Sequence, residues 1–144
     1  MKRYALLALA AGLLVAAAPD DAKNDLKKLD GTWVLASGEN DGKKISADTL
    51  KTGQLTIDGD KHTVKVGDTT YKGTHKLDPT AKPKTIDITP TNGDNKGKTS
   101  LGIYDLDGDT LKICWAPAGK DRPTEFKSAD GSGVFLAVHK KAKE

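Results

Sequence analysis

Three aspartates at alternate positions, Asp105, Asp107 and Asp109, are the densest group of side chains in this sequence that could hold a metal ion. A helix–loop–helix calcium site needs oxygen ligands at alternate positions, then a glycine, then a glutamate at position twelve. Here Gly108 follows the second aspartate, and position twelve counted from Asp105 is Ala116. Strand-like sequence flanks both sides of the segment, so we interpret Asp107-Gly108 as a hairpin turn and predict no metal site.

The single cysteine, Cys114, is a candidate nucleophile only if a base lies beside it, because the reactive form of a thiol is the thiolate. The chain has three histidines, His62, His75 and His139, and the sequence places none of them next to Cys114. Their spacing also fits no zinc-ligand pattern. We therefore interpret Cys114 as a half-buried structural thiol, and we expect no catalytic residue, no metal and no cofactor.

Carboxylates on strands are a second set of candidate catalytic residues, since a pair of them can serve as general acid and base. Asp87, Asp105 and His75 would be the residues of a carboxylate-dependent hydrolase or isomerase. Asp87 alternates with Ile86 and Ile88, so its side chain faces the other side of the strand. Solvent-facing strand residues show the same pattern, so the sequence does not distinguish a catalytic carboxylate from a surface one.

The only arginine outside the first 18 residues, Arg122, lies in the proline-containing segment 116–123. A planar guanidinium can bind a carboxylate bidentately or stack on an aromatic ring, so Arg122 is either a structural clamp to an acidic neighbour or a ligand contact. If the strands close into a barrel, one face of each strand points into the lumen. The candidates for the wall of a ligand pocket are then Tyr71, Asp87, Tyr104, Trp115 and Arg122.

The elements that must position these residues are short strands, because apolar and polar residues alternate with a period of two through most of the chain. Asp-Gly and Asn-Gly pairs, which favour tight hairpin turns, separate the runs. Between residues 19 and 29, early acids, late lysines and the spacing of Leu26 and Leu29 predict a short helix. We expect strands over Thr32–Ser37, Gln54–Asp58, His62–Val66, Thr69–Leu77, Lys84–Thr89, Thr99–Leu106, Thr110–Trp115, Thr124–Phe126 and Val134–His139.

Short strands joined by hairpins, with almost no helical periodicity, predict an all-β antiparallel up-and-down meander. A meander of about eight to ten strands loses its exposed edges when it closes, so we expect a β-barrel with a short N-terminal helix. A two-sheet β-sandwich is the alternative. The single cysteine allows no internal disulfide, so packing and sheet hydrogen bonds must supply the stability.

The N-terminus has the pattern of a secretory signal peptide: Lys2 and Arg3, an apolar run, and alanines before Pro19. We expect export to the periplasm or the extracellular space, with no membrane insertion after cleavage. Loss of the leader lowers the formal net charge from +3 to about +1, which indicates no nucleic-acid partner. The expected divisions are a signal peptide over 1–18, a flexible segment over 19–25, the barrel domain over 26–140 and a basic tail over 141–144.

Gly31-Thr32-Trp33 follows the expected helix and begins the first strand. A Gly-x-Trp at this position resembles the lipocalin signature, in which the tryptophan closes one barrel end against a cation near the last strand. Lys140 or Lys141 lies just after the last expected strand and stands in for the arginine usual in that family. We expect Gly31, Trp33 and Lys140 to form this closure.

Longer segments resemble an exported lipocalin-like domain family of unknown function that is abundant in planctomycete bacteria. The resemblance covers roughly residues 26–140 and is carried by the motifs PKTIDI, GIYDLDGDTLKICW and GKDRPTEF. It implies a lipocalin-like β-barrel and brings no established activity, cofactor or catalytic residue.

From the expected fold we expect a monomeric binding module, and not an enzyme, for a small apolar or amphipathic ligand or a partner peptide. An envelope interaction protein that uses its outer surface is an alternative from a different class. The carboxylate-dependent hydrolase or isomerase is the third.

Overall fold

The computed structural model describes residues 17–142 of the chain and the side chains of residues 23–142. Most of the expected signal peptide, residues 1–16, therefore lies outside the described residues, as does the end of the expected basic tail, residues 143–144. Within the described range the elements are α1 (Ala17–Leu29), β1 (Gly31–Asn40), β2 (Lys43–Lys44), α2 (Ala47–Thr52), β3 (Gln54–Asp58), β4 (Lys61–Val66), β5 (Thr69–Asp78), β6 (Thr85–Pro90), β7 (Ser100–Asp107), β8 (Thr110–Trp115) and β9 (Phe135–Lys141).

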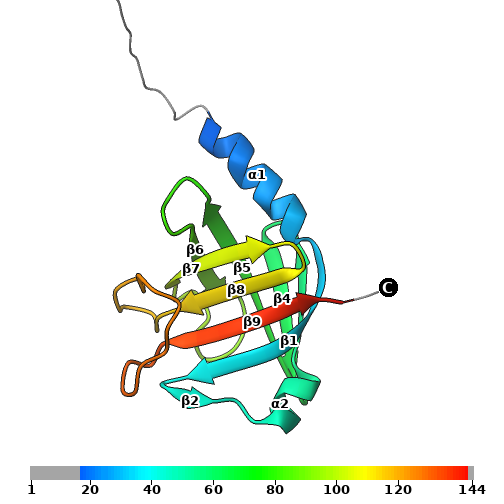
Figure 1. The fold of residues 1–144 in the computed structure, drawn as a ribbon, viewed down its shortest axis with the longest axis vertical. Coiled ribbons are helices and arrows are strands. Elements are labelled where there is room, and N and C mark those ends of the chain that lie inside the picture. The colour runs from blue at the N-terminus through cyan, green and yellow to red at the C-terminus, as the bar shows by residue number, and fades with distance from the viewer. Residues whose placement is uncertain (1–16, 143–144) are drawn as a thin grey trace, which may run out of the picture.

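The strands form one antiparallel sheet that closes on itself (Figure 1). β1 pairs with β3, each strand from β3 to β8 pairs with the next along the chain, and β9 pairs back with β1. The result is a closed eight-stranded up-and-down barrel, with β2 attached beside the end of β1 as an additional strand. The predicted barrel is confirmed, and the alternative two-sheet sandwich is excluded.

Three of the hairpins turn through two-residue loops with the sequence Gly-Asp: Gly59-Asp60, Gly67-Asp68 and Gly108-Asp109. The glycines have φ values of 62°, 60° and 59°, which glycine adopts without steric cost. Glycine at the first loop position is typical of the hairpin turn whose twist matches that of the flanking strands. The aspartate-rich segment is therefore a hairpin turn, centred one residue later than predicted.

The side chains that point into the barrel form one contiguous core. Its largest members include Trp33 and Tyr104, each 1% exposed, and Leu111, which is 0% exposed. Burial of each such side chain contributes about 1.5–3 kcal/mol to the free energy of unfolding. The other residues of this core cluster are Leu29, Leu55, Ile57, Leu77, Ile86 and Ile113.

Helix α1 meets the barrel at one end, which we call the closed end, and projects away from it (Figure 1). Only the C-terminal part of α1 reaches the strands, where Leu29 is buried in the core and Leu26 packs against it. The opposite end, which we call the open end, carries the connections 41–53, 67–68, 91–99 and 116–134. The short helix α2 belongs to the first of these connections and has no buried residue.

One expectation about the N-terminal part of the chain and two about the C-terminal part need correction. Segment 19–25, expected to be flexible, lies inside α1, and Asp25 within it is buried. Lys141, assigned to the tail, is the last residue of β9. Segment 124–126, expected to be a strand, is part of the connection between β8 and β9.

There are physical reasons why segment 124–126 forms no strand and why β2 and α2 were not predicted. The carbonyl oxygens of Glu125 and Lys127 contact the Cys114 sulfur instead of a neighbouring strand, and the Lys127 amide bonds the Glu125 carbonyl at 2.9 Å. This local turn uses the backbone groups that a strand would need. β2 and α2 contain only two and six residues, too few for a periodic pattern to be recognised in the sequence.

Candidate functional site

Side chains that point into the barrel at the open end are only half-buried. Tyr71 pairs with Val64 across the sheet and alternates along β5 with Gly73 and His75, so its ring is on the inward face. It is nevertheless 55% exposed. The half-buried side chains on the same face are Val64, Val66, Ile88, Trp115 and Phe135. Of the predicted pocket residues, Tyr71 and Trp115 therefore lie at this end of the barrel.

An aromatic pair forms part of the open end. Trp115 of β8 stacks on its cross-strand partner Phe135 of β9, with ring centroids 4.5 Å apart and an interplanar angle of 16°. On its other side Trp115 pairs with Gly102, where a Cβ atom would lie 2.8 Å from the Trp115 Cβ. The absence of a side chain at position 102 therefore leaves space for the indole ring.

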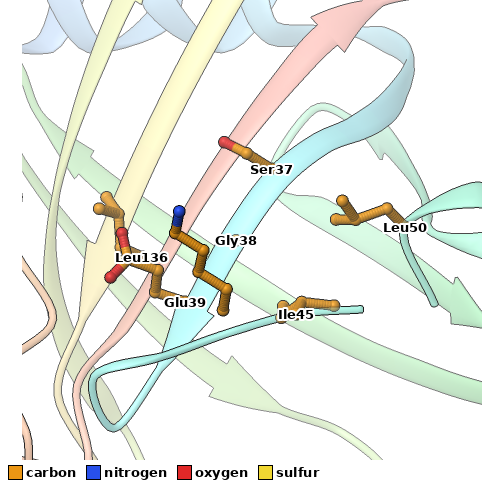
Figure 2. Close-up of a pocket in the computed structure, with 7 residues that line it drawn as sticks. Ser37, Gly38, Glu39, Ile45, Leu50 and Leu136 are labelled. Carbon is orange, nitrogen blue, oxygen red and sulfur yellow. The ribbon is translucent and has the colours of Figure 1, made fainter. Parts of the chain in front are cut away.

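A depression with a volume of ≈ 320 Å³ lies beside the second half of β1 (Figure 2). β3 pairs with β1 only from Gly31 to Val34, so beyond that point β1 is bordered by β2 and α2 instead of a full-length strand. Small-molecule sites typically have volumes of about 300–1,000 Å³. The depression is lined by the apolar residues Ile45, Leu50 and Leu136, the polar residues Ser37, Glu39 and Lys44, and Gly38.

Short-range contacts hold Ile45 and Leu50 at this depression. The Ile45 amide donates to the Gly38 carbonyl at 2.9 Å, and the Ile45 Cδ1 atom lies 2.6 Å from where a Cβ at position 38 would stand. Ser46 caps α2, since its hydroxyl accepts a hydrogen bond from the Thr49 amide at 3.2 Å. Leu50 follows within the same helix and points toward β1 (Figure 2).

None of the five predicted pocket residues lines this depression. Sequence reasoning missed Ile45 and Leu50 because they belong to no periodic pattern. The available signal was two isolated apolar residues within the otherwise polar segment 41–53.

Asp87 and Arg122 lie on the outer face of the barrel and not in its lumen. One terminal nitrogen of Arg122 is 2.8 Å from the Asp87 carboxylate, and the other donates to the Gly102 carbonyl at 2.8 Å. These contacts fasten the connection 116–134 across β6 and β7. The arrangement is that of a structural clamp, and it leaves neither residue available to a ligand inside the barrel.

The same connection covers Cys114, which is 0% exposed on the outer face of β8. The Cys114 sulfur lies 3.5 Å from the Glu125 carbonyl oxygen and 3.7 Å from that of Lys127. Burial raises the pKa of the Cys114 thiol, so the unreactive protonated form is favoured at neutral pH. Cys114 is fully buried, where the sequence predicted half-burial.

Tyr104 points inward at the closed end and belongs to a buried polar group there. Its hydroxyl donates to the Asp25 carboxylate at 2.6 Å, and the Lys84 ammonium lies 3.1 Å from the same oxygen. Burial and the hydrogen bond to Asp25 raise the pKa of Tyr104 far above its usual value, so the hydroxyl remains a donor. Tyr104 is therefore a core residue that anchors α1, and sequence reasoning missed its partner Asp25.

Trp33 also closes this end of the barrel. Its indole N–H donates to the Leu29 carbonyl at 2.8 Å, and the Lys141 ammonium lies 4.8 Å from the centre of its ring. Lys140, the predicted cation, instead donates to the Thr110 hydroxyl at 2.6 Å, because successive strand residues point to opposite faces. Gly31 has a φ of 126°, a backbone conformation that side-chain-bearing residues rarely adopt, so glycine is favoured there. The lysine over Trp33 is thus Lys141.

The barrel also encloses histidines. His75 Nε2 lies 2.9 Å from the Gly59 carbonyl and His75 Nδ1 lies 3.0 Å from His62 Nδ1. A carbonyl oxygen can only accept, so the neutral His75 carries its proton on Nε2, and His62 donates to it. Burial is the main cause that lowers the pKa of both rings, that of His62 to about 4.

His139 is the third histidine on the inward face of the barrel. It pairs with Leu111 and Leu35, which places it on the inward face of β9. Among the residues whose side chains the structure describes, its Nδ1 atom is the one buried side-chain nitrogen or oxygen without a hydrogen-bond partner. Burial lowers the pKa of His139 to about 4, so the ring is neutral at pH 7.

The residues of the hydrolase or isomerase alternative are not brought together. Asp87 is bound to Arg122 on the outer face, Asp105 is exposed on that face, and His75 is inside the barrel. Within the described range, no three His, Cys, Asp or Glu residues gather as a metal ion would require. The same part of the chain contains no helix with the length and apolar character needed to cross a membrane.

A scan against protein-family models finds no match for this chain, and a search of curated proteins finds none either. The function must therefore be argued from the geometry of the barrel itself.

Proposed function

We propose that this protein is an exported binding module for a small, partly apolar molecule, held in the depression beside β1. The observation that carries the proposal is that depression, which has a volume of ≈ 320 Å³ and whose apolar lining residues are Ile45, Leu50 and Leu136. The polar residues Ser37, Glu39 and Lys44 line it as well. A mainly apolar surface with a few polar groups is typical of small-molecule sites.

The barrel interior is less completely filled by side chains at the open end than at the closed end, and this difference supports the open end as the binding region. At the closed end the lumen is filled, as shown by the complete burial of Leu111. At the open end, Tyr71 is 55% exposed although it points inward. Apolar surface left exposed in this way is stabilised when a partly apolar molecule covers it. The N-terminal leader pattern supports export.

Binding can be measured by the fluorescence of N-phenylnaphthylamine, a neutral aromatic probe, with each variant compared with the wild type. Leu50→Ser removes an apolar contact from a helix that buries no residue, so the fold should be retained. We expect the dissociation constant to rise about fivefold to tenfold, the cost of one lost apolar contact. Val34→Ser is the matched control, because Val34 is 43% exposed on the outer face away from the depression, and it should have little effect.

Two results would count against the proposal. A loss of affinity in Tyr71→Ser but not in Leu50→Ser would move the site into the mouth of the barrel. A wild-type protein that binds no probe, and that carries no small molecule when native mass spectrometry is applied after purification from its own envelope, would remove the binding function altogether.

A further inference from the structure

A second concave site lies at the closed end of the barrel, away from the depression beside β1. It is a cleft of ≈ 410 Å³ between the C-terminal turns of α1 and the β7–β8 hairpin. Asp25 and Lys28 line it from the helix, and Leu106 and Asp109 line it from the hairpin. Lys84 and Lys141 complete its wall, together with the edge of the buried Trp33.

The charges in this cleft are not balanced. Asp25 is already bound to the Tyr104 hydroxyl and to Lys84, so its negative charge is compensated within the protein. Lys141 donates to a neutral acceptor, the Asp30 carbonyl, at 2.5 Å. Ion pairs among the residues whose side chains are described are Lys84–Asp25 and Arg122–Asp87, so neither Lys28 nor Lys141 has a carboxylate within 4.0 Å.

The positions of these lysines suit an anion that also has an apolar part. The apolar residues that line the cleft are Leu106, which is half-buried, and Trp33, which is 1% exposed. The Lys141 nitrogen is held 4.8 Å from the centre of the Trp33 ring, which fixes the position of its charge. Asp109 at the rim opposes a second negative charge on the ligand, because like charges at short range repel.

We infer that the closed-end cleft binds a small organic monoanion, a carboxylate or sulfonate attached to a compact apolar group. The anionic group lies between Lys28 and Lys141, and the apolar group contacts the half-buried Leu106. This site is separate from the depression beside β1, and no residue is shared between them.

The probe for this site is anilinonaphthalene sulfonate, which is N-phenylnaphthylamine with one sulfonate added. The pair of probes therefore separates recognition of the charge from recognition of the aromatic rings. Lys28→Gln should weaken binding of the sulfonate probe about threefold to fivefold, the effect of one exposed charge, and leave binding of the neutral probe unchanged. Affinity for the sulfonate should also fall as salt is raised, since exposed charges are screened.

Matched controls exist on both elements. Lys27 is exposed on the same helix and does not line the cleft, and Lys140 is next to Lys141 on the opposite face of β9. Lys27→Gln and Lys140→Met should each leave the affinity for the sulfonate within about twofold of the wild type, whereas Lys141→Met should lower it.

If Lys28→Gln and Lys27→Gln lowered the affinity for the sulfonate probe equally, the affinity would depend on net charge in general, and the inference would be overturned. Unchanged binding of the sulfonate probe in both Lys28→Gln and Lys141→Met would do the same. Because the neutral probe reports on the depression beside β1, failure at the cleft is distinguishable from failure of the proposed function. Unfolding in urea checks that each variant retains its fold.

Discussion

The two ends of this barrel are built from the same eight strands, yet they are filled to very different degrees. At the closed end Trp33 and Tyr104 are each 1% exposed, and both polar groups have partners, the Leu29 carbonyl and the Asp25 carboxylate. At the open end the inward-facing Tyr71 is 55% exposed. The difference follows from the two helices, because α1 buries Leu29 in the core whereas α2 buries no residue.

The comparison separates the requirements of stability from those of binding. Closing a barrel end requires apolar side chains that enter the core and acceptors for every polar group buried with them. α1 supplies both, through Leu26, Leu29 and Asp25. α2 supplies neither, so it covers the side of the barrel without filling it. The closed end should therefore carry most of the stability, and the open end should tolerate change.

The largest expected effect is in the core. Leu111→Ala at the filled end should lower the free energy of unfolding by about 3–4 kcal/mol, since it leaves a cavity among fully buried side chains. Ile88→Ala at the open end should cost about 1–2 kcal/mol, because Ile88 is half-buried and its surroundings already contact solvent. Urea unfolding measures both values. Equal losses of unfolding free energy in the two variants would show that the two ends do not differ in their contribution to stability.

A smaller effect is expected from the two ion pairs. The Asp25 side chain is 7% exposed and that of Asp87 is 36% exposed. Asp25→Ala leaves the Tyr104 hydroxyl and the Lys84 ammonium without their acceptor, so we expect a loss of about 2–3 kcal/mol. Asp87→Ala should cost about 1 kcal/mol or less, as for exposed pairs.

Tyr104→Phe gives a control for the first of these variants. Tyr104→Phe removes one donor but leaves the Asp25–Lys84 pair. The free energy of unfolding should therefore fall by less than in Asp25→Ala. If Asp87→Ala proves as costly as Asp25→Ala, the outer clamp contributes as much as the anchor of α1.

A further prediction concerns the pH dependence of the free energy of unfolding. The folded-state pKa of His139 is about 4, below its unfolded value of 6.5, so the unfolded chain binds more protons between these values. The contribution of His139 is fully present above pH 6.5 and is lost as the pH falls toward 4, by at most about 1.4 kcal/mol per pH unit.

His139→Leu removes this titration without breaking a hydrogen bond of Nδ1, which has no partner. We therefore expect the variant to lose less stability than the wild type between pH 7 and pH 5, as measured by urea unfolding at each pH. The pair His62–His75 is present in both proteins, so its effect on the pH dependence cancels in the comparison. Parallel stability curves would show that His139 does not titrate in this way.

The barrel was predictable from the sequence because each strand and each hairpin turn is indicated by residues that are close together in the chain. Alternation such as Leu111, Ile113 and Trp115 marks one face of a strand, and Asp-Gly pairs indicate hairpin turns to within one residue of the observed loops. The same alternation also placed Asp87 opposite Ile86 and Ile88. Alternation does not show which of the two faces is the lumen, so the sequence alone makes Asp87 a candidate pocket residue although it lies on the outer face.

The sites depend on contacts between distant parts of the chain, which no local pattern contains. Asp25 and Tyr104 are 79 residues apart, and Arg122 and Asp87 are 35 apart. Ile45 and Leu50 line the depression only because β3 leaves β1 after Val34. Residues of this kind become recognisable once the register of the strands is known.

The burial of Cys114 makes the opening of one loop directly measurable. The connection 116–134 covers the sulfur, and Cys114 is the single cysteine in the chain. A thiol reagent can react only after this connection has moved away, so the labelling rate reports how often it opens. The change in this labelling rate on addition of a ligand for either end of the barrel would then show whether binding at that end slows the opening of the connection 116–134.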